Sequence, residues 1–97
     1  MQEKYMITHD GKAIILKFNF ITMELTIGGY SKHRAFIENI ITTYYNISAV
    51  PEMQFPQKNK LRYTIKCIPA KFREVLNNIT SDNAVTIEQV RAHGRML

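Results

Sequence analysis

Apolar and polar residues alternate along residues 12–28, which is the pattern of half-buried β-strands. The apolar face of the first run consists of Ile14, Leu16, Phe18 and Phe20, and that of the second run consists of Met23, Leu25 and Ile27. The pattern therefore predicts two strands joined near Asn19–Thr22. We expect Gly28 and Gly29 to end the second strand, because glycine weakens strand interiors.

An amphipathic helix of about 14 residues is predicted after this pair of strands. Ser31 is a favourable N-cap residue, and the helix is expected to end around Asn46. The apolar residues that recur every four positions are Phe36, Ile37, Ile40, Ile41, Tyr44 and Tyr45. Beyond the helix, Pro51 and Pro56 predict an irregular or edge segment over residues 50–57, because proline cannot donate to a strand ladder.

A strand and a second helix are predicted over the next part of the chain. Residues Asn59–Ile68 alternate again, and the side chains of their apolar face are Leu61, Tyr63, Ile65 and Cys67. Pro69 suits the first position of a helix, since its missing N–H would have no partner there. The apolar stripe of this helix consists of Phe72, Val75, Leu76 and Ile79.

Residues 84–90 fit two interpretations. Ala84–Ile87 has the composition of a strand, whereas Thr86–Gln89 has capping-box spacing with Gly94 as a helix stop. The favoured prediction is a strand over residues 84–90. The resulting element order, ββ-α-(β)β-α-β, predicts a single α+β domain over residues 1–97, with a small antiparallel sheet and two amphipathic helices packed on one face.

The composition fits one globular domain with a basic surface. The chain has 97 residues, of which 45% are apolar and 22% charged, and its net charge of +5 favours an acidic partner such as nucleic acid. The single cysteine excludes an internal disulfide and a zinc site with several cysteines. Neither a signal peptide nor a membrane-length apolar run is visible, which predicts a cytoplasmic protein, in the host cytoplasm if the source is viral.

The motifs of common enzyme classes are missing from the sequence. There is no GxSxG, HExxH, Walker or GxGxxG motif. The three histidines are His9, His33 and His93, and no two of them have the spacing of metal ligands. Cys67 lies on the apolar face of its strand, so we expect a buried, inert thiol. Asp10 precedes Gly11 and is interpreted as a turn residue. We therefore expect a protein that is not an enzyme, with no catalytic residue, no metal and no cofactor.

Cations line one face of the strand expected after residue 57. Alternation places them opposite the apolar side chains, and they are Lys58, Lys60, Arg62 and Lys66, with only Thr64 interrupting the row. Residues 53–73 carry six cations and no acid. One hypothesis is a surface for a polyanion, since a strand face selected for stability would intersperse glutamate. The other is an edge strand whose lysines oppose aggregation.

Cations also stand at the start of both predicted helices, and these are Lys32, Arg34, Lys71 and Arg73. Each opposes the helix dipole by about 0.3–1 kcal/mol before screening. Free backbone N–H groups together with cations suit a phosphate, which is the functional hypothesis. The alternative is that solvent screens the dipole, so that these positions went unselected.

Several aromatic residues are candidates for stacking on bases. They are Tyr30, Tyr44, Tyr45 and Phe55. Tyr44 and Tyr45 continue the apolar stripe of the first helix, so at least one of them is expected in the core. No RNP-like aromatic pattern occurs, which argues against an RNA-recognition motif.

Two segments resemble a known DNA-binding domain. The first combines a strand, a Gly-Tyr pair and a helix in ITMELTIGGYSKHRAFIENII, and the second combines a turn, a strand and a helix in KNKLRYTIKCIPAKFREVLNNIT. Residues 12–80 resemble the C-terminal double-wing DNA-binding domain of the MotA middle-transcription activators of T-even phages. The resemblance rests on this doubled order of elements, on the Gly29-Tyr30 pair and on Asn59. The resemblance implies that two wings, near Asn19–Thr22 and Gln57–Lys60, contact duplex DNA. The shorter first hairpin and the lack of a polymerase-contacting domain put transcription activation outside what it implies.

The leading hypothesis is a small basic nucleic-acid-binding regulator of transcription, of phage or mobile-element origin, with DNA favoured over RNA as its partner. The expected phosphate ligands are Lys58, Lys60, Arg62 and Lys66, helped by Lys32, Arg34, Lys71 and Arg73. The alternative is a protein-interaction module or inhibitor that docks on a host protein through a strand edge, with Met53, Phe55 and Tyr63 in the contact. No membrane contact is expected, and an unpaired strand at residues 84–91 would offer an edge for dimerisation.

Overall fold

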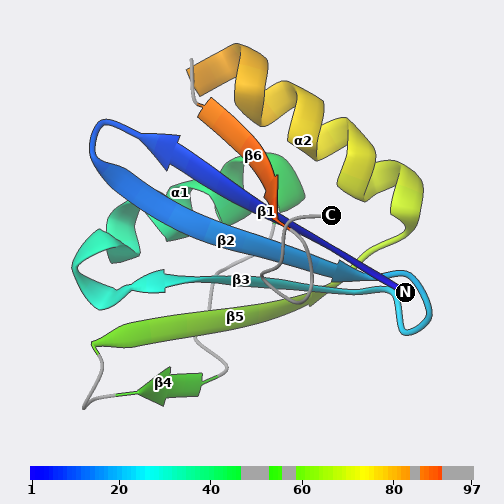
Figure 1. Ribbon diagram of the computed structural model, residues 1–97, viewed down its shortest axis with the longest axis horizontal. Coiled ribbons are helices and arrows are strands. Elements are labelled where there is room, and N and C mark those ends of the chain that lie inside the picture. The colour runs from blue at the N-terminus through cyan, green and yellow to red at the C-terminus, as the bar shows by residue number, and fades with distance from the viewer. Residues whose placement is uncertain (47–52, 56–58, 84–85, 91–97) are drawn as a thin grey trace.

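Six strands and two α-helices make up the protein in a computed structural model that describes residues 1–46, 53–55, 59–83 and 86–90, and side chains over residues 1–46 and 59–81. The elements in chain order are β1 (Gln2–His9), β2 (Lys12–Asn19), β3 (Glu24–Tyr30), a short 3₁₀ helix (Ser31–His33), α1 (Arg34–Tyr45), β4 (Met53–Phe55), β5 (Lys60–Lys66), α2 (Pro69–Asn83) and β6 (Thr86–Val90). The strands form one sheet in the order β4-β5-β3-β2-β1-β6, and all neighbours are antiparallel (Figure 1). The predicted α+β class is confirmed.

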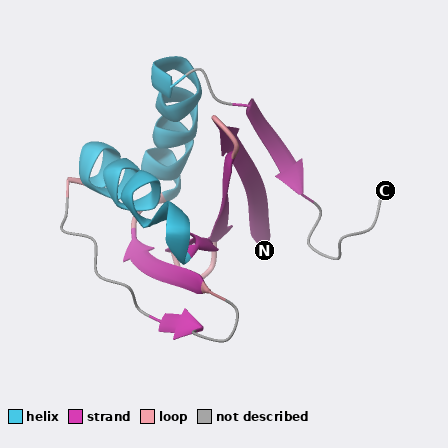
Figure 2. Cartoon of the chain, turned by 90° about the vertical axis from the view of Figure 1, so that its left-hand side faces the viewer, coloured by secondary structure: helices cyan, strands magenta, loops and turns pink. Residues whose placement is uncertain are grey.

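Both helices lie on the same side of the sheet (Figure 2), which is the arrangement predicted. The buried strand residues all belong to the face that meets the helices, and they are Ile7, Ile14, Leu16, Phe18, Leu25, Ile27, Leu61, Tyr63 and Ile65. The helices contribute Ile37, Ile40 and Ile41 from α1 and Phe72, Val75, Leu76 and Ile79 from α2. The rings of Phe18 and Phe72 stack with their centroids 4.6 Å apart, so the sheet and α2 share the centre of the core.

The strand β1 is the element that the sequence pattern did not predict. It pairs with β2 along its whole length, from Gln2 opposite Asn19 to His9 opposite Lys12. Ile7 is the one fully buried residue of β1, and the other residues of the strand are half-buried or exposed. The alternation of apolar and polar residues along β1 is therefore weak. Asp10 and Gly11 join the two strands with φ of 52° and 75°, the left-handed conformations of a tight hairpin turn. The turn expected at these residues is therefore confirmed.

The expectation that Gly28 and Gly29 end a strand is wrong, because β3 continues through both glycines to Tyr30. A Cβ on Gly29 would lie 3.1 Å from Cδ1 of Ile37, so this glycine lets α1 approach the sheet closely. Met23 also departs from its expected place on the apolar face. It is a turn residue with φ of 58° and is 44% exposed, and the strand begins one residue later.

The first helix starts later than the expected Ser31 cap. Residues Ser31–His33 form a single 3₁₀ turn, and α1 begins at Arg34 with no side-chain cap at its N-terminus. The backbone N–H of Ser31 instead donates to the carbonyl of Asn59 at 2.7 Å, which ties the start of this turn to the loop before β5. The predicted end is confirmed, since Asn46 follows the helix in the left-handed conformation.

The second half of the fold follows the sequence pattern closely. The strand β5, the start of α2 at Pro69 and a strand at Thr86–Val90 are confirmed, the last in preference to the capping-box interpretation. β6 pairs with β1, so the strand expected at residues 84–91 is not unpaired. The edge of β6 that faces away from β1 is the one left for the predicted dimerisation. No helix among the described residues is long and apolar enough to span a membrane.

Candidate nucleic-acid interface

The sheet has a face that points away from both helices, and we call it the open face. Because alternate residues of a strand point to opposite sides, its members follow from the register with the buried residues. Over β1, β2, β3 and β5, its cations are Lys4, Lys17, Lys60, Arg62 and Lys66. Glu24 is the one acid of these four strands on that face, so this part of the open face is basic. On the neighbouring strand β6, Glu88 is in register with Met6 of the same face.

Two of these cations lie directly opposite each other. Lys4 of β1 pairs in register with Lys17 of β2, and both residues are half-buried. Like charges at opposed positions of an antiparallel pair destabilise a sheet. An anion bound between the two ammonium groups would remove this repulsion, which makes the pair a candidate phosphate site.

Three cations of the predicted row, Lys60, Arg62 and Lys66, lie on the open face of β5, where Lys60 and Lys66 are exposed and Arg62 is half-buried. The edge-strand explanation fits only one end of this row. β5 lies between β3 and β4, and Lys60 and Arg62 are opposite residues of β4. Aggregation through a free strand edge therefore does not explain these two cations. Lys66 lies beyond the paired part of β4, where it is 3.8 Å from the carboxylate of Glu24 and donates to the carbonyl of Thr22.

An apolar hollow of about 390 Å³ opens among these cations. Met6 and Ile15, neighbours in register on β1 and β2, give it apolar side chains, and Gly28 opposite Ile15 gives it depth because it has no side chain. Its remaining lining residues are Ala13, Gly29, Tyr30, Lys60, Leu61 and Arg62. The open face thus combines positive charge with an apolar depression.

Tyr30 is the exposed aromatic residue at the end of β3. It is 48% exposed, and the amino groups of Lys32 and Lys60 lie 5.9 and 5.6 Å from its ring centroid. Tyr30 lines a second hollow of about 470 Å³, together with Ser31, Lys32 and Asn59. Since it also lines the first hollow, Tyr30 connects the cation of the 3₁₀ turn with the open face.

The structure places three of the predicted phosphate ligands, Arg34, Arg73 and Lys71, away from this surface. Arg34 donates to Glu38 at 3.2 Å within α1, and the Tyr63 hydroxyl donates to the same carboxylate at 2.9 Å. Burial, with this hydrogen bond, raises the pKa of Tyr63 to about 12. Tyr63 is 1% exposed, so the expectation that it forms part of a docking edge is wrong.

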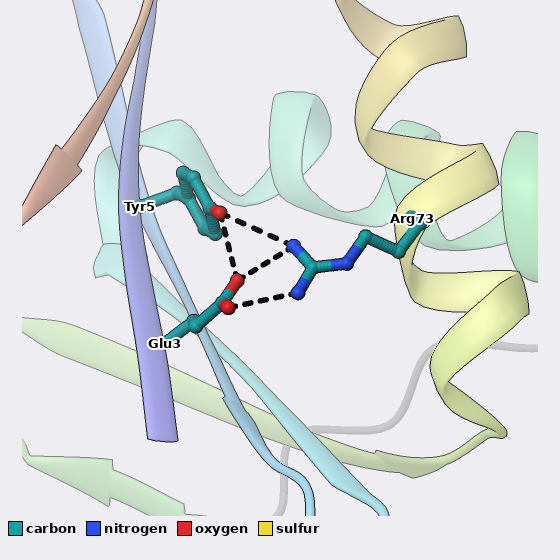
Figure 3. A network of polar contacts seen from close by, with 3 residues as sticks. All are labelled: Glu3, Tyr5 and Arg73. Carbon is teal, nitrogen blue, oxygen red and sulfur yellow. Dashed lines mark hydrogen bonds and ion pairs between the residues drawn. The ribbon is translucent and has the colours of Figure 1, made fainter. Parts of the chain in front are cut away.

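Arg73 of α2 also has a partner (Figure 3). Its guanidinium donates to both carboxylate oxygens of Glu3, at 2.7 and 2.8 Å, and lies over the rings of Phe20 and Phe72. The hydrogen bond from Arg73 lowers the pKa of Glu3, whereas burial raises the pKa of the Tyr5 hydroxyl that donates to Glu3. This network joins α2 to β1 on the helix side of the sheet. A phosphate role for Arg73 would require it to leave Glu3.

Two further site residues complete the predicted set. Lys71 is half-buried in the first turn of α2, near Cys67, and it lies off the open face. Lys58 lies outside the described residues, as do the side chains of Met53 and Phe55. The candidate stacking residues Tyr44 and Tyr45 pack against the core. Cys67 is half-buried, so the expectation of a fully buried thiol is wrong, although burial raises its pKa.

Lys4 and Lys17 are the open-face cations that the sequence analysis did not include among the candidate site residues. Without β1, neither the facing of Lys4 nor its opposition to Lys17 was visible. The Asp10-Gly11 pair was the available signal, since this dipeptide favours a two-residue hairpin turn.

Comparisons with protein-family models, curated proteins and solved structures found no match to this chain. The resemblance to the double-wing domain therefore stays a prediction. Within the part of the chain that the structure describes, no three side chains of histidine, cysteine, aspartate or glutamate gather as metal ligands would.

Proposed function

We propose that this protein binds nucleic acid through the open face of its sheet. The observation that carries the proposal is the concentration of five cations, Lys4, Lys17, Lys60, Arg62 and Lys66, against the single carboxylate of Glu24 on four adjacent strands of that face. Lys32 extends this basic surface past the end of β3. A polyanion with regularly spaced phosphates is the ligand class that such a surface suits.

The open face would bind nucleic acid and orient it on the sheet, and the proposed role is that of a regulator that acts by binding nucleic acid. Contacts with phosphates position a protein without reading the sequence, so affinity would be largely electrostatic. The apolar hollow and Tyr30 add groups that contact bases rather than phosphates. Regulation of transcription in a phage is the corresponding biological proposal, supported only by the resemblance of residues 12–80.

Charge reversal on the two sides of the sheet tests this function. We expect Lys17→Glu to weaken binding of DNA and RNA oligonucleotides and to make the salt slope shallower by about 0.7 for a single strand, or about 0.9 for a duplex, for each phosphate that the variant no longer binds. Lys12→Glu is the matched control. It changes the net charge equally, but Lys12 lies at the Asp10–Gly11 turn, where its amino group is 3.5 Å from Asp10, and it belongs to the helix side of the sheet.

The measurement is fluorescence anisotropy of labelled oligonucleotides over a series of salt concentrations. Equal affinities for the wild type and Lys17→Glu, with both proteins folded, would show that the open face does not bind. Equal decreases of affinity in Lys12→Glu and Lys17→Glu would show that net charge, and not its placement, governs association. Lys71→Glu tests the predicted contribution of the α2 start in the same assay.

Docking on a host protein is the second candidate function, and a different region supports it. Ile21 and Met23 at the β2–β3 turn are 77% and 44% exposed, and Ile68 before α2 is 60% exposed. The carbonyl of Met23 accepts the N–H of Cys67 at 3.1 Å, so these apolar side chains belong to one end of the molecule. If Ile21→Ser abolished capture of a partner while leaving oligonucleotide affinity unchanged, protein docking would be a separate activity of this end.

A further inference from the structure

We infer that the ligand of the open face is single-stranded nucleic acid, with one base stacked on Tyr30 and a neighbouring base in the hollow at Gly28. This inference rests on the proposed function and specifies its ligand. Two independent features support it, which are the environment of an exposed aromatic ring and the shape of an apolar depression beside it.

Tyr30 has the position of a stacking platform. The residue is 48% exposed, at the end of β3. The amino groups of Lys32 and Lys60 lie over the ring within 6 Å of its centroid, so a stacking base would displace two cations that stay close enough to contact its flanking phosphates. When a base covers the ring, these flexible lysines are free to turn toward phosphates.

The hollow beside Tyr30 suits a base more than a phosphate. Met6, Ile15 and Gly28 make its interior apolar, and Lys60 and Arg62 stand among its lining residues. A strand of nucleic acid is complementary to this arrangement, because a flat, weakly polar base would lie in the apolar interior and the charged backbone beside the cations. The hollow and the Tyr30 ring adjoin, since Tyr30 lines both depressions of this surface.

A duplex cannot use these two features. Its bases are covered on both faces by their neighbours in the stack, and they present only their edges in the grooves. Unpaired bases expose the faces that an aromatic ring and an apolar hollow contact. The cations of the open face contact phosphates in either form, so preference for a single strand depends on Tyr30 and the hollow alone.

The test compares three labelled oligonucleotides of one sequence, about 12 nucleotides long, as single-stranded DNA, single-stranded RNA and duplex DNA. We expect Tyr30→Ala to weaken binding of both single strands about tenfold and to leave duplex affinity and the salt slope unchanged. Tyr30→Phe retains the ring and is expected to bind like the wild type. Gly28→Val places a side chain in the hollow and is therefore expected to weaken single-strand binding as Tyr30→Ala does. The fold has room for it, because a Cβ at this position meets only the Leu61 carbonyl, at 3.4 Å.

Each outcome separates this inference from the function on which it rests. If Tyr30→Ala and Gly28→Val leave single-strand affinity unchanged, or lower single-strand and duplex affinity equally, while Lys17→Glu weakens both, the open face binds phosphates and the inference is wrong. If Lys17→Glu has no effect on any oligonucleotide, the proposed function itself is wrong. A different affinity for RNA and DNA single strands would identify which sugar the surface accepts. Thermal unfolding of each variant verifies that it is folded.

Discussion

Under the proposed function, Tyr30 and the Lys4–Lys17 pair are the residues at which stability and binding compete. Lys4 and Lys17 face each other across two strands, although an opposite-charge pair there would stabilise the sheet by roughly 0.2–1 kcal/mol. The lysines beside Tyr30 gain about 0.5–1 kcal/mol from an exposed cation–π contact, whereas a stacked base gains about 1–3 kcal/mol. The two lysine contacts together amount to about 1–2 kcal/mol, which is comparable to one stacked base, so these magnitudes allow a base to replace the lysines on the ring.

The Glu3–Arg73 ion pair gives the protein a specific pH dependence. The pKa of Glu3 in the folded state lies below its unfolded value of 4.5, chiefly because Arg73 donates a hydrogen bond to it. Its contribution to the free energy of unfolding is therefore fully present above pH 4.5 and disappears as the pH falls through the folded pKa. Both side chains are partly exposed, so we expect about 1 kcal/mol or less.

The matching variant is Glu3→Gln, which should lower stability at pH 7 and leave a shallower decline of stability between pH 5 and pH 3. Glu24→Gln is the control, because the Glu24 carboxylate meets Lys66 only at 3.8 Å on exposed side chains. Urea unfolding at a series of pH values measures both. An equal decline with pH in the wild type and Glu3→Gln would contradict the assignment.

At the scale of elements, two adjacent glycines of β3 have opposite roles. Gly29 faces α1, and a Cβ there would lie 3.1 Å from Ile37 and 3.3 Å from the Ala13 carbonyl, so Gly29→Ala is expected to destabilise by about 1–3 kcal/mol. Gly28 faces the open side, and a Cβ there makes one ordinary contact, so Gly28→Ala should change stability by less than about 0.5 kcal/mol. Urea unfolding compares the two, and equal destabilisation would mean that α1 does not pack against Gly29.

The sequence predicts those elements whose stability comes from a periodic apolar face. The stripes of β2, β5, α1 and α2 were visible because Leu16, Tyr63, Ile40 and Phe72 repeat at strand or helix spacing and are buried. β1 was missed because it lies within the sheet with few apolar side chains, held by ladders to β2 and β6. Such backbone pairing between distant segments leaves little trace in local composition.

The candidate site was predictable only where it lies on one strand. The β5 cations follow from alternation, so Lys60, Arg62 and Lys66 were identified from the sequence and lie on the open face. Arg34 and Glu38 have the i,i+4 spacing of a helical ion pair, which the sequence shows, whereas Glu3 approaches Arg73 only through the packing of α2 against β1. The opposition of Lys4 and Lys17 on the open face could be found only from the register of β1 and β2.

Over the whole molecule, the sheet separates two electrostatic environments. On the helix side, Arg73 and Arg34 are neutralised by Glu3 and Glu38 at 2.7 and 3.2 Å. On the open face of β1, β2, β3 and β5, five cations accumulate around an apolar hollow, and Glu24 is the one acid of these four strands there. A net charge of +5 therefore understates the field at this face, since placement and not the total determines where a polyanion binds.

The salt dependence of binding to a single-stranded oligonucleotide tests the central claim most directly. Each bound phosphate contributes about −0.7 to the slope of log K against log salt concentration for a single strand. With three to five open-face cations engaged, we expect a slope between about −2 and −3.5 for the wild type. Lys17→Glu should bring it closer to zero, and Lys12→Glu should leave it unchanged. A wild-type slope near zero would contradict the account.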